Sequence, residues 1–420
     1  MRTGLTELPL STKATVMSSE NTLIGPDRDG NYLQTEGSKI RTFGPSPSSV
    51  EGAVSCPDGQ LKPGRVCAHT HLYSGLAPLG LPAPEIAPEN FVQILERVWW
   101  RLDRALDARS LDASARYYIA NALLDGTTSL VDHHESPNFI EGSLDVLGTA
   151  CTELGMRAAL CFGATERNGG VVEGRRGLAE CARFVKSNHH PLLRGLVGLH
   201  ASFTVSDSSI EEAGRLCREL GVGMHIHVAE ADSDVADAKE RGYESPFDRL
   251  VELGGLPPRS VLVHGVHATR EQVLHGEKLG AWWVHNPRSN KGNRVGYASA
   301  LSAANDGALG TDGYPAKMLE EQQALFEEAE AAGDSLSKVK SRQENGAKMV
   351  GMLFDLPLGQ LVPGAAADVI VEGENGVMHV LVDGEWVVRD GRLVNADLAA
   401  IKEAAEQEAP RLWSLMATYQ

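Results

Sequence analysis

Two histidines that lie two residues apart, His69 and His71, are the residues whose spacing most directly suggests chemistry. On a strand their side chains would point to the same face, because side chains alternate along a strand. Two adjacent imidazoles form half of a metal site. The motif is weak by itself, but three later apolar segments also end in residues that can bind a metal, namely His227, His264 and Asp312.

The elements that must position these side chains are apolar strands that alternate with helices. The pattern predicts eight strands, at residues 65–72, 127–133, 157–162, 196–200, 223–228, 260–264, 281–286 and 308–311. It also predicts helices at residues 91–106 and 209–220. Eight strand–helix units indicate a (β/α)₈ barrel, in which functional residues lie at the C-terminal ends of the strands.

Both ends of the chain have β character and flank this barrel. Residues 1–62 contain short β-prone pieces at 15–17 and 39–43. Strands are predicted again at residues 367–371, 377–382 and 385–388, with Asp-Gly turns at 383–384 and 390–391. A helix is predicted at 398–418. We therefore predict one small β domain from residues 1–62 and 351–420, the latter including the terminal helix, around a barrel at residues 63–350.

The composition indicates a soluble globular protein that binds a small molecule. The 420 residues are 42% hydrophobic and 23% charged, with a net charge of −17. This charge argues against partners with a phosphate backbone and against anionic membrane surfaces. No apolar run approaches the roughly 20 residues of a membrane span, and residues 1–17 lack the apolar region of a signal peptide. We expect a cytoplasmic protein without nucleic-acid or membrane partners.

Some residues near the expected site have structural interpretations. The six cysteines are scattered without a Cys-x-x-Cys motif, so they are expected to be reduced packing residues, with Cys67 in the barrel core. His225 is expected to point away from the barrel interior. His200, at the end of the fourth strand, is expected either to contact the substrate or to be a structural histidine.

Further polar residues lie at or just beyond predicted strand ends. His133 and His134 end the second strand, and one of them must face the interior, where it would contact the substrate or support the site. Tyr73 is expected to form part of the pocket wall. Residues in the loops after the third and seventh strands would either recognise a heterocycle edge or form salt-bridged loops: Glu166, Arg167, Arg288 and Ser289.

Several motifs together resemble the amidohydrolase superfamily. They are Pro-Gly before His-Thr-His at 69–71, His-Val-Ala-Glu at 227–230, Asn-Pro-Arg-Ser-Asn at 286–290, Gly-Thr-Asp at 310–312 and the segment 358–368. The match spans nearly the whole chain and is most similar to the aminohydrolase branch, which includes metal-dependent deaminases and triazine-type hydrolases. His133-His134 and residues 164–168 resemble a group of aminohydrolases of uncertain substrate. Arg65 and Cys67 depart from the commoner pattern.

The resemblance implies one divalent metal per subunit, zinc or iron, bound by His69, His71, His227 and Asp312. Such a donor set suits a borderline metal with an open position, and the metal lowers the pKa of a bound water from about 15.7 towards 7. Binuclear relatives need a lysine at the end of strand four. This chain has His200 there and no lysine between Lys186 and Lys239, which favours a single metal. The family also tends to form homo-oligomers, dimers or higher.

The implied reaction is hydrolytic deamination of a small purine-, pterin-, pyrimidine- or triazine-like ring, with release of ammonia. Glu230 would relay protons, His264 would stabilise the tetrahedral adduct, and Asp312 would complete the catalytic group. Removal of chloride or alkylamine, or opening of a cyclic amide, is an alternative. A catalytically inactive metal-binding protein is a second alternative, against which the presence of Glu230 and His264 argues.

Overall fold

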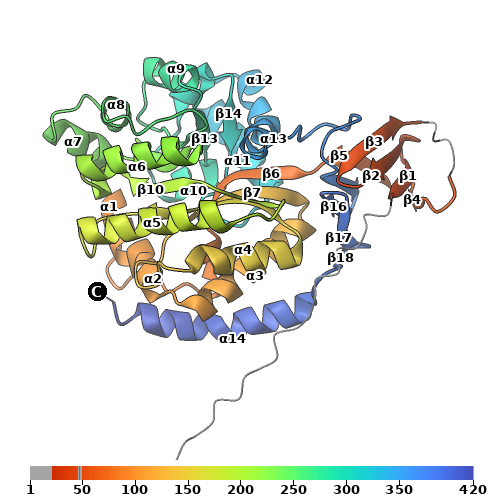
Figure 1. Cartoon of the computed structure of the whole chain (residues 1–420), viewed down its shortest axis with the longest axis horizontal. Coiled ribbons are helices and arrows are strands. Elements are labelled where there is room, and N and C mark those ends of the chain that lie inside the picture. The colour runs from red at the N-terminus through yellow and green to blue at the C-terminus, as the bar shows by residue number, and fades with distance from the viewer. Residues whose placement is uncertain (1–20, 46, 48–49, 420) are drawn as a thin grey trace, which may run out of the picture.

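Eight parallel strands form a barrel on one side of the molecule (Figure 1). They were traced in a computed structural model that describes residues 21–45, 47 and 50–419. A bridge between Thr70 and Asp312 joins the last strand to the first and closes the barrel. All eight predicted strands are present: β6 (Arg65–Thr70), β7 (Thr127–His134), β8 (Arg157–Ala164), β10 (Val197–Ala201), β11 (Met224–Val228), β12 (Val261–His264), β13 (Trp282–His285) and β14 (Gly307–Leu309).

Helices cover the outside of this barrel (Figure 1). The predicted helix at 209–220 starts two residues earlier, with Ser206 at the N-cap position. The short strand β9 (Leu193–Gly195) pairs with β8. The helices of the barrel region are α3 (Ala108–Leu124), α4 (Ser143–Leu154), α5 (Val171–Ser187), α6 (Asp207–Leu220), α7 (Asp232–Glu240), α8 (Pro246–Glu252), α9 (Arg270–Lys278), α10 (Pro287–Gly292), α11 (Met318–Ala331), α12 (Leu336–Val339) and α13 (Ser341–Phe354).

The predicted helix at 91–106 contains a π-helical turn. It consists of α1 (Phe91–Ile94), the π turn Leu95–Trp99 and α2 (Trp100–Ala105). A π turn holds one more residue than an α turn and therefore rotates the helix face that follows it, and such turns are frequent at functional sites. In this helix the turn is followed directly by Trp100, which lines an inner cavity together with Trp99.

The two chain ends form one small β unit beside the barrel, on the right in Figure 1. Strand β5 (Gly59–Pro63) pairs antiparallel with β15 (Val369–Gly373) and so joins the ends. The predicted piece at 15–17 lies outside the described residues, and the exact domain boundaries stay predictions. The remaining strands are β1 (Leu23–Asp27), β2 (Tyr32–Glu36), β3 (Lys39–Gly44), β4 (Val54–Cys56), β16 (Gly376–Val382), β17 (Glu385–Arg389) and β18 (Arg392–Leu393).

A buried ion pair connects this β unit to the barrel. The Nε and Nη2 atoms of Arg157, on β8, lie 2.8 and 2.9 Å from the carboxylate oxygens of Asp368. The backbone nitrogen of Asp383 donates to the same carboxylate over 2.8 Å. Asp383 and Gly384 both have positive φ, as the predicted Asp-Gly turn requires. Asp368 therefore fixes the turn and the barrel strand together.

The last helix of the chain lies against the barrel. Helix α14 (Leu398–Met416) confirms the predicted terminal helix and packs on α2 and α3 along the lower side in Figure 1.

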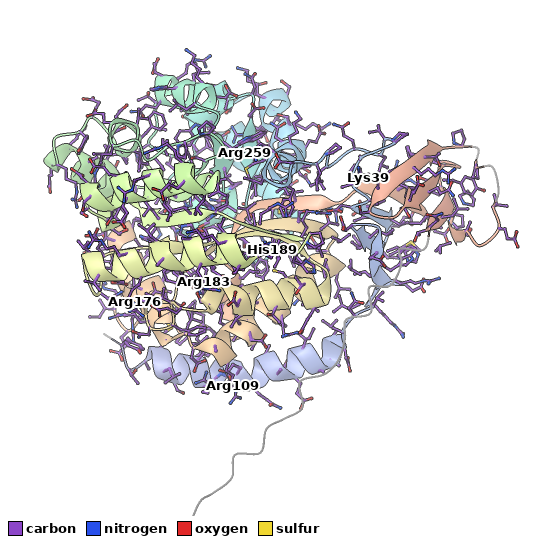
Figure 2. The ribbon with its side chains drawn as sticks, in the orientation of Figure 1. Lys39, Arg109, Arg176, Arg183, His189 and Arg259 are labelled. Atoms are coloured by element: carbon purple, nitrogen blue, oxygen red, sulfur yellow. The ribbon has the colours of Figure 1, made fainter. Side chains whose placement is uncertain are left out.

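Figure 2 shows Arg176 and Arg183 on α5 and His189 after it, and the side chain of His189 is exposed. Among the described residues, no helix has the length and apolar character needed to span a membrane.

Candidate active site

Four side chains converge at the C-terminal end of the barrel. The Nε2 atoms of His69 and His227 lie 3.3 Å apart. The Oδ1 atom of Asp312 lies 2.8 Å from Nε2 of His71 and 3.3 Å from Nε2 of His69. All four residues are buried, and their ligand atoms lie within 4.8 Å of one another. The structure thus brings together the four residues that the sequence suggested as metal ligands.

Hydrogen bonds to the other ring nitrogens fix the tautomers of these histidines. The Nδ1 of His71 donates to the carbonyl of His133 over 2.5 Å, and that of His227 donates to the carbonyl of His200 over 2.7 Å. Each Nε2 therefore points into the cluster. Contacts of this kind orient metal-binding histidines in proteins.

The third histidine of the cluster is oriented by His225, contrary to the sequence prediction. His225 is fully buried inside the barrel, and its Nε2 lies 2.9 Å from Nδ1 of His69. The prediction was wrong because residues i and i+2 of a strand share a face. His225 and His227 therefore both point inwards. Burial lowers the pKa of His225 well below 6.5, so its neutral ring accepts a hydrogen from His69.

The surroundings of Asp312 favour one positive charge beside its carboxylate. Burial lowers the pKa of His69 to about 3, so this ring is neutral. Burial also disfavours charge on His71, but the carboxylates of Asp312 and Glu135 raise the pKa of His71 to about 9. Ser289 donates to the second oxygen of Asp312. A divalent cation would displace the proton held between His71 and Asp312.

Glu230 and His264 lie beside the cluster. Oε2 of Glu230 is 3.4 Å from Nε2 of His264, and Oε1 accepts from Nδ2 of Asn293 over 3.3 Å. His264 places its other nitrogen, Nδ1, 2.8 Å from Oδ1 of Asn290, so its Nε2 stays free. Burial raises the pKa of Glu230 well above 4.5. A carboxyl group of this kind can accept and deliver protons.

The backbone is strained where these groups leave their strands. Three residues that are not glycine have left-handed φ angles here: Ala229 at 52°, His264 at 76° and Asp312 at 53°. Such a conformation costs about 1–3 kcal/mol per residue and concentrates at functional sites. At Ala229 it turns the chain immediately before Glu230. Local strain thus directs the acid side chain towards the cluster.

An aromatic cavity opens above these groups. Its walls include Phe91, Leu95, Trp99, Trp100 and Phe203, and it also exposes Tyr73, Glu135, His200 and the cluster residues His71, His227 and Asp312. The inner cavity has a volume of about 40 Å³. An outer cavity of about 1200 Å³ shares Phe91, Trp99, Asn293 and Gly313 with it. Flat aromatic walls over a polar floor suit a planar ring.

The sequence of the barrel region matches a known family. The model of the Amidohydrolase family matches residues 61–387. This chain belongs to the amidohydrolase family.

Three proteins illustrate what this amidohydrolase resembles. It is 27% identical over 391 residues to 5'-deoxyadenosine deaminase of Methanopyrus kandleri, covering 84% of this chain and 87% of the relative. It is 26% identical over 427 residues to 8-oxoguanine deaminase of Pseudomonas aeruginosa, covering 90% and 93%. The crystal structure of an adenosine deaminase from Xanthomonas campestris with bound zinc superimposes with a TM-score of 0.78 at 22% identity, covering 94% and 98%.

Some residues predicted for the pocket rim of the amidohydrolase lie elsewhere. Oε1 of Glu166 accepts from the backbone nitrogen and hydroxyl of Ser206, where it caps helix α6. Arg288 binds the carboxylates of α11 and the carbonyl of Pro315. Nε2 of His134 donates to the hydroxyl oxygen of Ser136 over 2.7 Å, because that hydroxyl already donates to the carbonyl of Phe139. The ring of His134 packs on Phe162. None of the three lines the inner cavity.

Two other predictions are resolved at the barrel axis. Of the adjacent pair, it is His133 that faces the interior, with its ring centroid 4.6 Å from that of His227. Tyr73 and His200 line the inner cavity. Burial lowers the pKa of His200 to about 3, so its ring is neutral.

Sequence reasoning missed Glu135 and its contact with Arg167. Glu135 directly follows β7, and its Oε2 lies 2.9 Å from Nη2 of Arg167. The same nitrogen lies 2.7 Å from Oδ2 of Asp103, and the guanidinium stacks 4.7 Å from the ring of Trp100. The signal that identified His69 and His227, a polar residue at a strand end, also applies to Glu135.

Proposed function

We propose that this amidohydrolase deaminates a small aminated N-heterocycle by hydrolysis, with one divalent metal, zinc or alternatively iron, held by His69, His71, His227 and Asp312. The observation that carries the proposal is the convergence of three oriented imidazoles and a carboxylate on the floor of an aromatic cavity, beside Glu230. Three nitrogen donors with one oxygen donor suit both metals. The deaminase relatives and the zinc-containing structure support the same assignment.

The metal, when bound, lowers the pKa of a water so that it becomes a nucleophile at neutral pH. Glu230 takes a proton from this water and passes it to a substrate nitrogen. Because Nδ1 of His264 donates to Oδ1 of Asn290, its free Nε2 accepts a hydrogen bond from the hydroxyl that adds to the ring carbon and so orients it. The C–O bond forms, the exocyclic C–N bond breaks, and the water protons end on the ring nitrogen and on the departing ammonia.

Substrate entry requires movement of the helix at Phe91–Trp100. The inner cavity of about 40 Å³ holds little more than a water, whereas the outer cavity of about 1200 Å³ holds a whole heterocycle. Phe91 and Trp99 separate the two. We propose that the ring passes between these side chains and that ring substituents remain in the outer cavity.

Replacing Glu230 tests the proposed proton relay. Glu230→Gln should lower kcat for ammonia release by about 10²–10⁴-fold, because the amide cannot transfer protons. Metal content should be unchanged, since Glu230 is not among the four ligands. Asp232→Asn is the matched control: its carboxylate is 96% exposed and lies two residues further along. Wild-type turnover by Glu230→Gln would contradict the mechanism.

Replacing His69 tests the metal assignment separately. His69→Ala removes one of four ligands, so stoichiometric zinc or iron should be lost from the purified protein. Full retention of the metal would contradict the ligand set. The expected homo-oligomer and cytoplasmic location stay predictions, as does the expectation of a small-molecule substrate without nucleic-acid or membrane partners.

A further inference from the structure

Three polar atoms face one another beside the inner cavity without forming hydrogen bonds. Oε1 of Glu135 lies 3.6 Å from Nδ1 of His133 and 3.7 Å from Nε2 of His200. Both distances exceed those of a hydrogen bond. Nδ1 of His133 is fully buried and has no partner among the described residues. The tautomer of His200 decides whether its Nε2 is a donor or an acceptor.

His200 presents a lone pair to Glu135. The hydroxyl of Thr204 donates to the carbonyl of Ala201 over 3.0 Å, so its oxygen can only accept from Nδ1 of His200, 2.9 Å away. The hydrogen of the neutral ring therefore sits on Nδ1. The opposite nitrogen, Nε2, has no hydrogen and points at the carboxylate.

His133 is too far from Glu135 to hydrogen-bond it. Its Nε2 lies 3.0 Å from the carbonyl of Leu199 and donates to it, because a carbonyl only accepts. This contact holds the ring in place, with Nδ1 3.6 Å from Oε1 of Glu135. Neither imidazole therefore supplies a hydrogen bond to Oε1.

The carboxylate of Glu135 cannot turn away from the two imidazoles. Arg167 holds its other oxygen, Oε2, and Arg167 is itself held by Asp103 and by the face of Trp100. Arg167 and Asp103 are also buried, with 7% and 1% of their side chains exposed. Oε1 of Glu135 is therefore kept towards the imidazoles by a network that spans three separate chain segments.

A buried acceptor without a donor costs free energy, and a ligand that supplies the donor recovers it. Glu135 and His200 both line the inner cavity, next to the ligands His71 and His227. Building on the proposed function, we propose that Glu135 and His200 together bind an N–H edge of the substrate. The substrate would then be a ring with an N–H or second amine besides the leaving amine, as in guanine- or pterin-type rings. Adenine-type rings substituted at N9 offer only acceptors there.

A matched pair of substrates tests this preference. 9-Methylguanine and 9-methyladenine have similar size and no N9 hydrogen, but only the first retains a ring N–H beside its leaving amine. With metal-loaded wild-type protein we expect kcat/KM for ammonia release to be at least about 100-fold higher for 9-methylguanine, because an unpaired buried polar group strongly discriminates against the wrong ring. Equal turnover of both rings would overturn the inference and leave the deaminase proposal intact.

An isosteric variant identifies Glu135 as the residue responsible. Glu135→Gln adds a donor in place of a carboxylate oxygen, so kcat/KM for 9-methylguanine should fall about 10- to 100-fold while that for 9-methyladenine rises or stays constant. Glu141→Gln is the control, because Glu141 lies in the following loop with 63% of its side chain exposed. An equal loss for both rings would mean that Glu135 is merely structural and would overturn the inference.

A binding measurement separates this inference from the catalytic proposal. Metal-loaded Glu230→Gln should bind 9-methylguanine more tightly than 9-methyladenine in calorimetry, and adding Glu135→Gln should remove the difference. This result does not depend on turnover, so it holds even if another leaving group proves to be the natural one. Two metal ions per wild-type chain, reduced to one by Glu135→Gln, would assign these three polar atoms to a second metal and overturn the inference.

Discussion

Replacing His225 should weaken metal binding without unfolding the barrel. In wild-type protein His225 accepts the Nδ1 hydrogen of His69 over 2.9 Å and so keeps the Nε2 lone pair of His69 directed at the cluster. His225→Leu fills a similar volume but provides no acceptor. The hydrogen on Nδ1 then has no partner in a fully buried position, and the tautomer that binds metal is no longer favoured.

Two independent estimates give the size of this effect. Loss of a hydrogen-bond partner behind a metal ligand lowers metal affinity about 10- to 100-fold, which corresponds to about 1.4–2.7 kcal/mol at 1.36 kcal/mol per decade. A buried donor without a partner costs about 1–3 kcal/mol. The ranges overlap, so we expect a decrease of one to two orders of magnitude in zinc affinity.

Competition with a chelator of known zinc affinity measures the change. His225→Gln is the control, because its amide oxygen can accept from His69 and should restore affinity to within about threefold of wild type. Circular dichroism should show that both variants are folded. Wild-type zinc affinity in folded His225→Leu would refute the argument that His225 orients the ligand, and equal losses in both variants would indicate a packing effect instead.

Two substitutions test packing around the site. Gly310→Ala, just after β14, would place a Cβ 2.5 Å from Oδ1 of Asn286 and 2.8 Å from the β6 backbone, so it should destabilise the protein by about 1–3 kcal/mol in urea unfolding and lower metal affinity. Gly307→Ala, at the start of β14, would place its Cβ no closer than 3.7 Å to its neighbours and should do neither. Asp368→Asn removes the buried one of the two carboxylates that pair with Arg157 and leaves only the partly exposed Asp383, so it should cost about 3 kcal/mol of unfolding free energy. Asp355→Asn, which breaks an exposed pair with the arginine at 259 labelled in Figure 2, should cost about 0–1 kcal/mol. Equal effects within either pair would contradict the packing and burial arguments.

The residues at strand ends were the part of the site that could be predicted best from the sequence. His69, His71, His227 and Asp312 lie at or just beyond the C-terminal ends of three barrel strands, and barrel closure brings such positions together whatever the intervening loops do. The loop residues behaved differently. Glu166 and Arg288 also follow strands, yet their side chains bind Ser206 and the carboxylates of α11 instead of the cavity. Loop direction depends on contacts that no periodic pattern encodes.

The error at His225 has a simple physical cause. Its separation of two residues from His227 already placed both on one face, so the alternation rule, correctly applied, predicts an inward ring. The register with β10 and β12 then sets which inward histidine joins the cluster of metal-ligand residues and which lies below it. Sequence alone could identify the face but not the depth along the barrel axis.

The barrel, its eight strands, the small β unit from both ends and the donor types of the metal-ligand cluster could all be predicted from the sequence. These follow from hydrophobic periodicity and from residues at strand ends, which are local properties of the chain. The tautomers of the histidines and the contacts of Glu135 became evident only in the folded chain. Arg167 lies 32 residues from Glu135 and 64 from Asp103, and the three meet because strand ends and the π-containing helix converge over one cavity. Hydrogen-bond direction depends on those distant partners, and it decides which nitrogen can bind a metal or accept from a substrate.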